Sequence, residues 1–179
     1  MTEREIIIGS REGKQKCQKL LYDSHCRIVM GICLRYTKNK EDAEDLFQNI
    51  FVTIFTKLDE FKFLGSFEGW IKKIAIHTII DWLRRKQFLK NLDIIQFEDM
   101  DAQFIEEFFI EEEEEPLSQE DILNALNKLP DGYRTVINLF LIEKYTHREI
   151  AQMLGCSEET SRSQCYKGKR LLREKLMKK

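Results

Sequence analysis

The stretch from Tyr145 to Leu176 constrains the fold most strongly, because two helix signals flank a three-residue turn. Thr146 and Glu149 have the spacing of a capping box, in which a hydroxyl and a carboxylate satisfy each other's backbone amides at a helix start. Gly155 ends this helix, since glycine takes positive φ without a steric penalty, and Ser157 can cap the next one. The stretch predicts a helix-turn-helix, a motif that can place its second helix in the DNA major groove.

The second helix of this motif has two chemically different sides. Small residues share one side, which can pack closely against the first helix: Ser161, Cys165, Gly168 and Leu172. Polar, aromatic and cationic residues share the other side: Glu159, Arg162, Ser163, Tyr166, Lys167 and Arg170. Residues 160–179 contain eight Lys or Arg and one acid, Glu174. A solvated basic tail would not require a capped helix pair, so we predict contact with DNA phosphates and base edges.

The charges of the chain fall into three blocks that the formal net charge of -2 conceals. Residues 1–90 have a balance of +5, residues 91–127 have -13 with no Lys or Arg, and residues 128–179 have +6. Glutamate occupies seven of the ten positions from 106 to 115, so repulsion predicts an extended, weakly packed segment there. Two basic blocks joined by an acidic one are typical of a nucleic-acid-binding protein.

Helical periodicity dominates the first block. Apolar residues repeat at helical spacing through residues 10–36. Asn39 can cap a second helix, in which an apolar stripe from Ala43 to Leu58 keeps the i, i+3, i+4, i+7 pattern. The other side of that helix could be a solvated face or an interface, and it contains Glu41, Asp45, Gln48, Asn49 and Val52.

A phenylalanine-rich stretch from Phe61 to Gly69 breaks the helical pattern. Such a stretch is more often a core connection, but its rings and glycines would also let unstacked bases approach. Helical spacing resumes at Trp70 and continues to Lys86. Four cations of this helix could meet phosphates, whereas its two tryptophans are more typical of a core; the cations are Lys72, Lys73, Arg84 and Arg85.

The last block predicts a second group of helices. Apolar residues from Ile122 to Leu129 indicate one helix that Pro130 ends, and Val136 to Ile142 indicate another that leads into the helix-turn-helix. The fold class is therefore all-α, with two small helical domains joined by an acidic flexible linker. We predict a first domain over residues 1–90, a linker over 91–117 and a second domain over 118–179.

No pattern in the sequence is typical of catalysis. The three histidines are scattered, and there is neither a glycine-rich phosphate loop nor a nucleophile paired with a base, so we predict no enzyme activity and no cofactor. The five cysteines contain no Cys-x-x-Cys pair and no standard zinc spacing around His25, which favours packed thiols and no metal site. No apolar run is long enough for a bilayer, so we expect a soluble cytoplasmic protein without stable membrane insertion.

Three segments together resemble the extracytoplasmic-function (ECF) sigma factors of the bacterial sigma-70 family. They are DAEDLFQNIF (42–51), FEGWIKKIA with DWLRR (67–75 and 81–85), and LPDGYR with AQMLGCSEETSRSQ (129–134 and 151–164). The resemblance implies a sigma2-like helical bundle that binds the clamp helices of the β′ subunit of core RNA polymerase and reads the minus-ten promoter element. It also implies a sigma4-like helix-turn-helix domain that reads the minus-thirty-five element.

Position by position, the resemblance implies roles for particular side chains. The polymerase-binding residues would be Asp45, Gln48, Asn49 and Val52. The minus-ten contacts would be Phe61, Lys62, Phe63, Gly65, Ser66, Trp70, Lys73, His77, Arg84 and Arg85. The minus-thirty-five contacts would be Arg148, Thr160, Arg162, Ser163, Tyr166, Lys167 and Arg170. Four positions depart from the family, which more commonly has Glu at 49, Asn at 77, Val at 161 and Arg at 164. The last two changes imply weaker packing and one charge fewer.

The partners implied by the resemblance are core RNA polymerase, promoter DNA as duplex and as melted non-template strand, and an anti-sigma factor. Two alternatives stay open from the residues alone. A stand-alone helix-turn-helix transcriptional regulator would bind specific duplex DNA tightly without polymerase. An interaction protein whose acidic segment mimics DNA would bind no promoter even with polymerase present.

Overall fold

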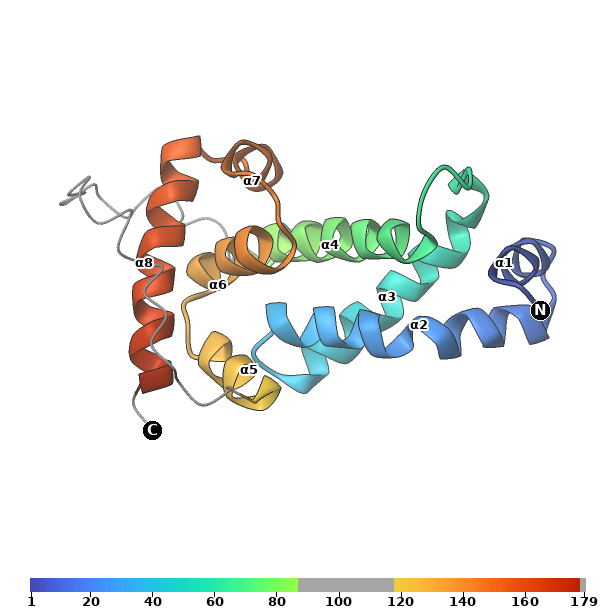
Figure 1. Ribbon diagram of the computed structural model, residues 1–179, viewed down its shortest axis with the longest axis horizontal. Coiled ribbons are helices and arrows are strands. Elements are labelled where there is room, and N and C mark those ends of the chain that lie inside the picture. Colours follow the sequence, from blue (N-terminus) through green and yellow to red (C-terminus); the bar gives the residue numbers. More distant parts are fainter. Residues whose placement is uncertain (87–117, 178–179) are drawn as a thin grey trace. The chain divides into compact units, whose positions relative to one another are not determined.

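The computed structural model describes residues 1–86 and 118–177. The chain divides into two compact units, residues 1–86 and residues 87–179, and both are helical over the described residues (Figure 1). The predicted all-α class with two helical domains is confirmed. The acidic linker predicted for residues 91–117 lies outside the described residues.

The first unit is a bundle of three long helices with a short helix at its N-terminus. Its elements are α1 (Glu3–Arg11), α2 (Gln15–Tyr36), α3 (Lys40–Thr56), the 3₁₀ turn η1 (Leu58–Glu60) and α4 (Phe67–Arg85). The helices α2, α3 and α4 each pack against the other two, and α1 packs against α2 (Figure 1). The helix α1 also packs against η1. The predicted apolar stripe of α3 is buried in this core, where Leu46, Ile50 and Ile54 are each 0% exposed.

Short polar caps set the starts of three helices of the first unit, α1, α3 and α4. Asn39 accepts a hydrogen bond from the amide of Asp42 and caps α3, as predicted. Ser66 accepts from the amide of Gly69, so α4 begins at Phe67, three residues before the predicted start. The helix α1 was not predicted, and its start is a capping box in which Thr2 and Glu5 exchange hydrogen bonds.

The second unit is assembled around its last helix. Its elements are α5 (Gln119–Asn127), α6 (Asp131–Ile137), the single π-helical turn η5 (Asn138–Ile142), α7 (His147–Leu154) and α8 (Glu158–Met177). The helix α8 packs against α5, α6 and α7 (Figure 1). The helix predicted from Val136 begins at Asp131 instead, because Pro130 has a φ of -54° and leads directly into a helical turn.

The helix-turn-helix is confirmed in its local detail. Thr146 and Glu149 form both hydrogen bonds of the capping box at the start of α7. Gly155 has a φ of 71°, and Ser157 Oγ accepts from the amide of Thr160 at 3.0 Å. Three of the four residues predicted to face inward on α8 are buried, namely Ser161, Cys165 and Gly168, and the fourth, Leu172, is partly exposed.

A histidine joins the two helices of this motif. Nδ1 of His147 lies 2.9 Å from Oγ of Ser161, which is 0% exposed, and a hydrogen bond connects them. The other side of the imidazole stacks on Phe140, with 4.3 Å between ring centroids. The weaker packing implied for serine at position 161 is therefore offset by a polar contact between α7 and α8.

Replacing Gly168 with alanine is expected to destabilise the second unit. A Cβ at this position would lie 2.9 Å from Cγ1 of Ile137 and 3.3 Å from Cβ of Tyr133, both on α6. This overlap should outweigh the gain in helix propensity and lower the free energy of unfolding by about 1–2 kcal/mol. Urea denaturation followed by circular dichroism measures the change.

Gly31→Ala in α2 is the matched control, since an added Cβ there meets nothing within 4 Å. It is expected to be neutral or to stabilise by up to about 1 kcal/mol. A Gly168→Ala variant as stable as the unsubstituted chain would contradict the packing described for α6 and α8.

A dependence of stability on pH is expected from His147. Desolvation lowers its pKa below the ordinary 6.5, and the nearby cations Arg162 and Lys169 lower it further. The unfolded chain then binds the proton more readily, so stability from the neutral ring is present above pH 6.5 and is lost as pH falls through the lower folded pKa. Between about pH 7.5 and about pH 5.5, the urea midpoint of the second unit should fall more than that of His147→Phe. Equal falls in the two proteins would refute this role of the imidazole.

Candidate polymerase and nucleic-acid interfaces

The helix α3 presents a stripe of four side chains to solvent on the side opposite its buried residues. This α3 stripe consists of Asp45, Gln48, Asn49 and Val52, all of them exposed. Their i, i+3, i+4, i+7 spacing aligns them along one face. Val52 is 65% exposed, and an apolar side chain among polar ones on a rigid helix is typical of a protein interface. The structure thus brings together all four residues predicted to bind polymerase.

An aromatic cluster fixes the position of α3 on α2 beside this stripe. The ring centroids of Tyr22 and Phe51 are 4.6 Å apart, and those of Phe47 and Phe51 are 4.9 Å apart. Tyr22 is 38% exposed at the edge of the cluster. These contacts hold the stripe on a preformed surface, which reduces the entropy lost when a partner binds.

The loop of residues 61–66 connects η1 to α4 and has a buried base. Phe61 is 6% exposed, and its ring centroid lies 5.0 Å from that of Phe67 and 5.5 Å from that of Trp70. Phe61 is one of the predicted minus-ten contacts, but the structure places its ring beneath the loop. In this position the ring supports the loop from inside.

The tip of the 61–66 loop is exposed. Leu64 is 93% exposed, and it is flanked by exposed polar or glycine residues, namely Lys62, Gly65 and Ser66. Leu64 is not among the residues that the resemblance assigned to the minus-ten element. Its position next to Gly65, in a stretch without helical spacing, is the sequence signal that could have indicated an exposed side chain. Phe63 is partly exposed and has a φ of 57°, a left-handed conformation that strains any residue other than glycine.

A groove of about 350 Å³ lies between the end of α3 and α4. It is lined by Thr53, Lys57, Trp70, Lys73, Ile74, His77, Thr78, Asp81 and Arg85. Four of the predicted minus-ten residues line this α3–α4 groove, and all four come from α4: Trp70, Lys73, His77 and Arg85. Arg84 does not line it and instead donates to Asp81 at 3.4 Å.

The charges of the groove favour an anionic ligand. Three cations, Lys57, Lys73 and Arg85, face a single carboxylate, Asp81. Lys57 was not among the predicted DNA contacts. It lies one helical turn after Thr53, and both residues line the groove. Three cations that line the groove together with the indole of Trp70 form a surface suited to the phosphates and bases of a single strand.

The predicted minus-thirty-five residues occupy α8 and the start of α7. Arg148, Arg162 and Arg170 are exposed, while four others are partly exposed: Thr160, Ser163, Tyr166 and Lys167. Nη2 of Arg162 donates to Oε1 of Glu158 at 2.6 Å, which holds the guanidinium along the helix. Gln164 is 3% exposed and therefore lies outside this basic side.

Within residues 1–86 and 118–177, no group of three or more His, Cys, Asp or Glu side chains is arranged to hold a metal ion. The five cysteines form no disulfide. No helix in these two ranges is both long and apolar enough to cross a membrane.

Two family models match the chain in the two helical units. Residues 21–88 match sigma-70 region 2, and residues 119–172 match sigma-70 region 4. The first match covers most of α2 and all of α3 and α4, whereas α1 lies before it. The second covers α5, α6, α7 and most of α8.

Whole proteins of the same kind are also similar to this chain. The ECF RNA polymerase sigma factor SigE of Mycolicibacterium smegmatis is 29% identical over 164 residues, which cover 88% of this chain but 61% of that protein. The ECF RNA polymerase sigma factor SigW of Bacillus subtilis is 27% identical over 186 residues, covering 98% of this chain and 97% of SigW.

A solved structure supports the same fold. The sigma factor RpoE of Bartonella quintana, crystallised with the anti-sigma factor NepR, has a TM-score of 0.54 at 19% identity and covers 89% of this chain and 96% of RpoE. The two region matches show that this chain belongs to the sigma-70 family of RNA polymerase sigma factors, and the relatives that it resembles are members of the ECF group of that family.

Proposed function

We propose that this chain binds core RNA polymerase and directs initiation at promoters that it reads at two elements. The observation that supports this most strongly is the coincidence of region 2 with the α3 stripe, loop and groove, and of region 4 with the basic side of α8. A stand-alone regulator would need the helix-turn-helix alone. It would have no use for the first unit's exposed loop beside a basic groove.

Polymerase binding is assigned to the α3 stripe, with the clamp helices of the β′ subunit as its partner. Val52, at 65% exposure, would be the apolar centre of the contact, and the neighbouring Asp45, Gln48 and Asn49 would supply hydrogen bonds at its rim. Asparagine at position 49 keeps the interface polar without adding a charge that must be desolvated.

Reading of the minus-ten element is assigned to the 61–66 loop and the α3–α4 groove. A base leaving the duplex would lie against the exposed tip at Leu64, while the phosphates of the non-template strand follow the groove cations. Trapping unstacked bases contributes about 1–3 kcal/mol for each base that is stacked on the protein, which favours the melted state. Lys73 and His77 lie on the groove wall, where they can reach this strand.

Reading of the minus-thirty-five element is assigned to α8, with Arg148 of α7 contacting the backbone. The exposed arginines would supply a salt-dependent attraction to phosphates, and contact with base edges is assigned to Arg162, Ser163 and Tyr166, which are exposed or partly exposed. The two elements are more than one helical turn, over about 34 Å, apart, so each unit reads one of them while polymerase sets their separation.

We also place the protein in the bacterial cytoplasm, where polymerase and promoters are found. An anti-sigma factor is a further partner in this proposal, since the similar RpoE of Bartonella quintana is crystallised with one.

The function can be tested by reconstitution. The purified chain, added to sigma-free core RNA polymerase and a library of promoter-sized duplexes, is expected to direct transcripts with defined starts. Val52→Asp should lower affinity for core polymerase at least about ten-fold, because a charge would enter the centre of the interface. Met177→Asp adds the same charge at a 56% exposed position of α8 and should leave that affinity unchanged. Absence of any defined start with the unsubstituted chain would overturn the proposal.

Removing the Arg162 side chain tests the role of α8. Arg162→Ala is expected to weaken holoenzyme binding to selected promoters about ten-fold and to relax base preference at one minus-thirty-five position. Lys128→Ala removes an exposed cation at the end of α5 and should change neither. Filter binding at several salt concentrations, with sequencing of the bound promoters, separates the two effects. Unchanged base preference in Arg162→Ala would assign Arg162 to the backbone alone.

A further inference from the structure

The helix α1 lies before the segment that matches sigma-70 region 2, yet it packs against η1, the turn that leads into the 61–66 loop. We propose that α1 positions this loop for promoter reading and that Arg11 is the positioning residue. The inference rests on the proposed function, because it concerns the loop assigned to the minus-ten element.

Arg11 holds the backbone where the loop begins. Its Nε donates to the carbonyl oxygen of Leu58 at 3.1 Å, its Nη2 donates to the carbonyl oxygen of Phe61, and Asp59 lies 3.8 Å from Nε. The carbonyl oxygen of Leu58 also accepts a hydrogen bond from the amide of Phe61 at 3.3 Å, so both acceptors of Arg11 are held in place by η1 and the residue that follows it. The planar guanidinium can satisfy two such fixed acceptors at once, which a lysine cannot do with the same geometry.

Two arginines of α1 also clamp the strained residue of the loop. The guanidinium carbon of Arg4 lies 4.9 Å from the ring centroid of Phe63, and that of Arg11 lies 5.0 Å from it. Both distances are within the range of cation–π attraction. A phenylalanine with a φ of 57° persists only where its surroundings hold it, and these contacts provide that restraint. Because the Phe63 ring is engaged by α1, the loop presents Leu64 outward.

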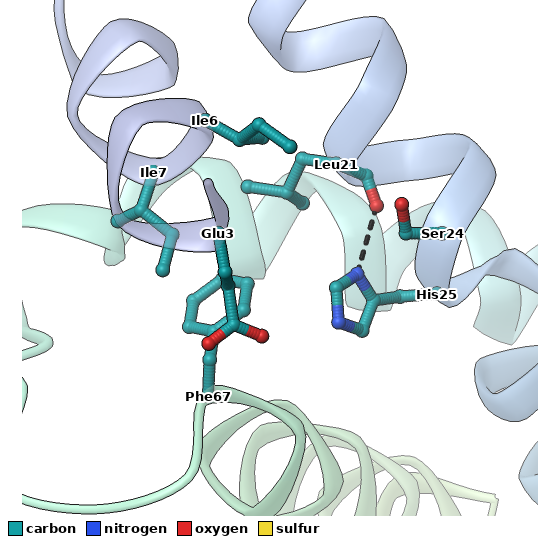
Figure 2. A pocket seen from close by; sticks show the side chains of 7 residues that line it. All are labelled: Glu3, Ile6, Ile7, Leu21, Ser24, His25 and Phe67. Atoms are coloured by element: carbon teal, nitrogen blue, oxygen red, sulfur yellow. Dashed lines mark hydrogen bonds between the residues drawn. The ribbon is translucent and has the colours of Figure 1, made fainter. Parts of the chain in front are cut away.

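The other end of α1 faces the far end of the loop. Figure 2 shows Glu3 and Ile7 of α1 facing His25 of α2 and Phe67, the first residue of α4, around a cavity of about 200 Å³. His25 is held by a hydrogen bond from its Nδ1 to the carbonyl oxygen of Leu21 (2.9 Å). The ring of Phe67 in turn supports Phe61. The helix therefore spans both ends of the loop.

The docking of α1 depends on tertiary contacts, because a helix of nine residues is not stable alone in water. Ile7 is 1% exposed, and Gly9 allows α1 to approach α2 so closely that an added Cβ would overlap Sγ of Cys17. A larger residue at position 9 would displace α1 while leaving Arg11 itself intact.

The experiment compares Arg11→Ala and Arg11→Lys with the unsubstituted chain in reconstituted holoenzyme. The probe is a library of duplex promoters with a randomised minus-ten segment and a constant minus-thirty-five element. Open complexes are detected by permanganate reactivity and sequenced. Both variants are expected to form about ten-fold fewer open complexes and to lose preference at the base that the loop captures, with affinity for core polymerase unchanged. Recovery of full activity by Arg11→Lys would overturn the proposal, because charge alone would then suffice.

Gly9→Val tests the same inference without altering an arginine. It should reproduce the loss of open complexes and of base preference, whereas Lys19→Ala, which removes an exposed cation of α2, should change neither. Urea denaturation of each variant checks that the three-helix core still unfolds cooperatively. If the unsubstituted chain directs no defined start, the proposed function fails; if it does so and the Arg11 and Gly9 variants match it, only the role of α1 is refuted.

Discussion

The burial of Leu46, Ile50 and Ile54 of α3 between α2 and α4 is the interaction on which the first unit depends. Each of these side chains contributes about 1.5–3 kcal/mol when fully buried, so the rotation of α3 about its axis is strongly specified. That rotation decides which residues remain outside. Because Val52 and its polar neighbours lie on the opposite face, the core also fixes the surface proposed for polymerase. The same helix ends next to the groove and the loop, so one packing solution positions all three surfaces.

The second unit solves a different problem, since α8 must pack closely and also present a basic side. Small buried residues allow the close approach, and Gly168 lies directly against Ile137 of α6. Ser161 forms a hydrogen bond with His147, which ties the start of α7 to α8. The basic side then points away from the core, and Arg162 is held near the helix by its hydrogen bond to Glu158.

Local signals made most of this structure predictable. The capping box at Thr146, the left-handed Gly155 and the cap at Asn39 involve residues close in sequence, and all three occur as expected. The residues of the α3 stripe and four residues of the groove followed from helical spacing once the family resemblance gave them a role. The helix α1 was missed although Thr2 and Glu5 form the same capping box, because its isoleucines at 6, 7 and 8 are consecutive rather than periodic. The burial of Phe61 depends on its packing against Phe67 and Trp70. The loop conformation that exposes Leu64 depends on Arg11, which lies 50 positions before Phe61, and no local pattern encodes that contact.

The contact between α1 and the 61–66 loop has a practical consequence for handling the protein. The residues that match the family model begin at position 21, so a fragment trimmed to them would lack Arg4 and Arg11 and would leave the loop without its brace. An affinity tag fused ahead of Thr2 would sit on the capping box that starts this helix. Promoter preferences measured with trimmed or N-terminally tagged protein would then reflect a loop without its α1 contacts. A C-terminal tag leaves this end of the molecule unchanged.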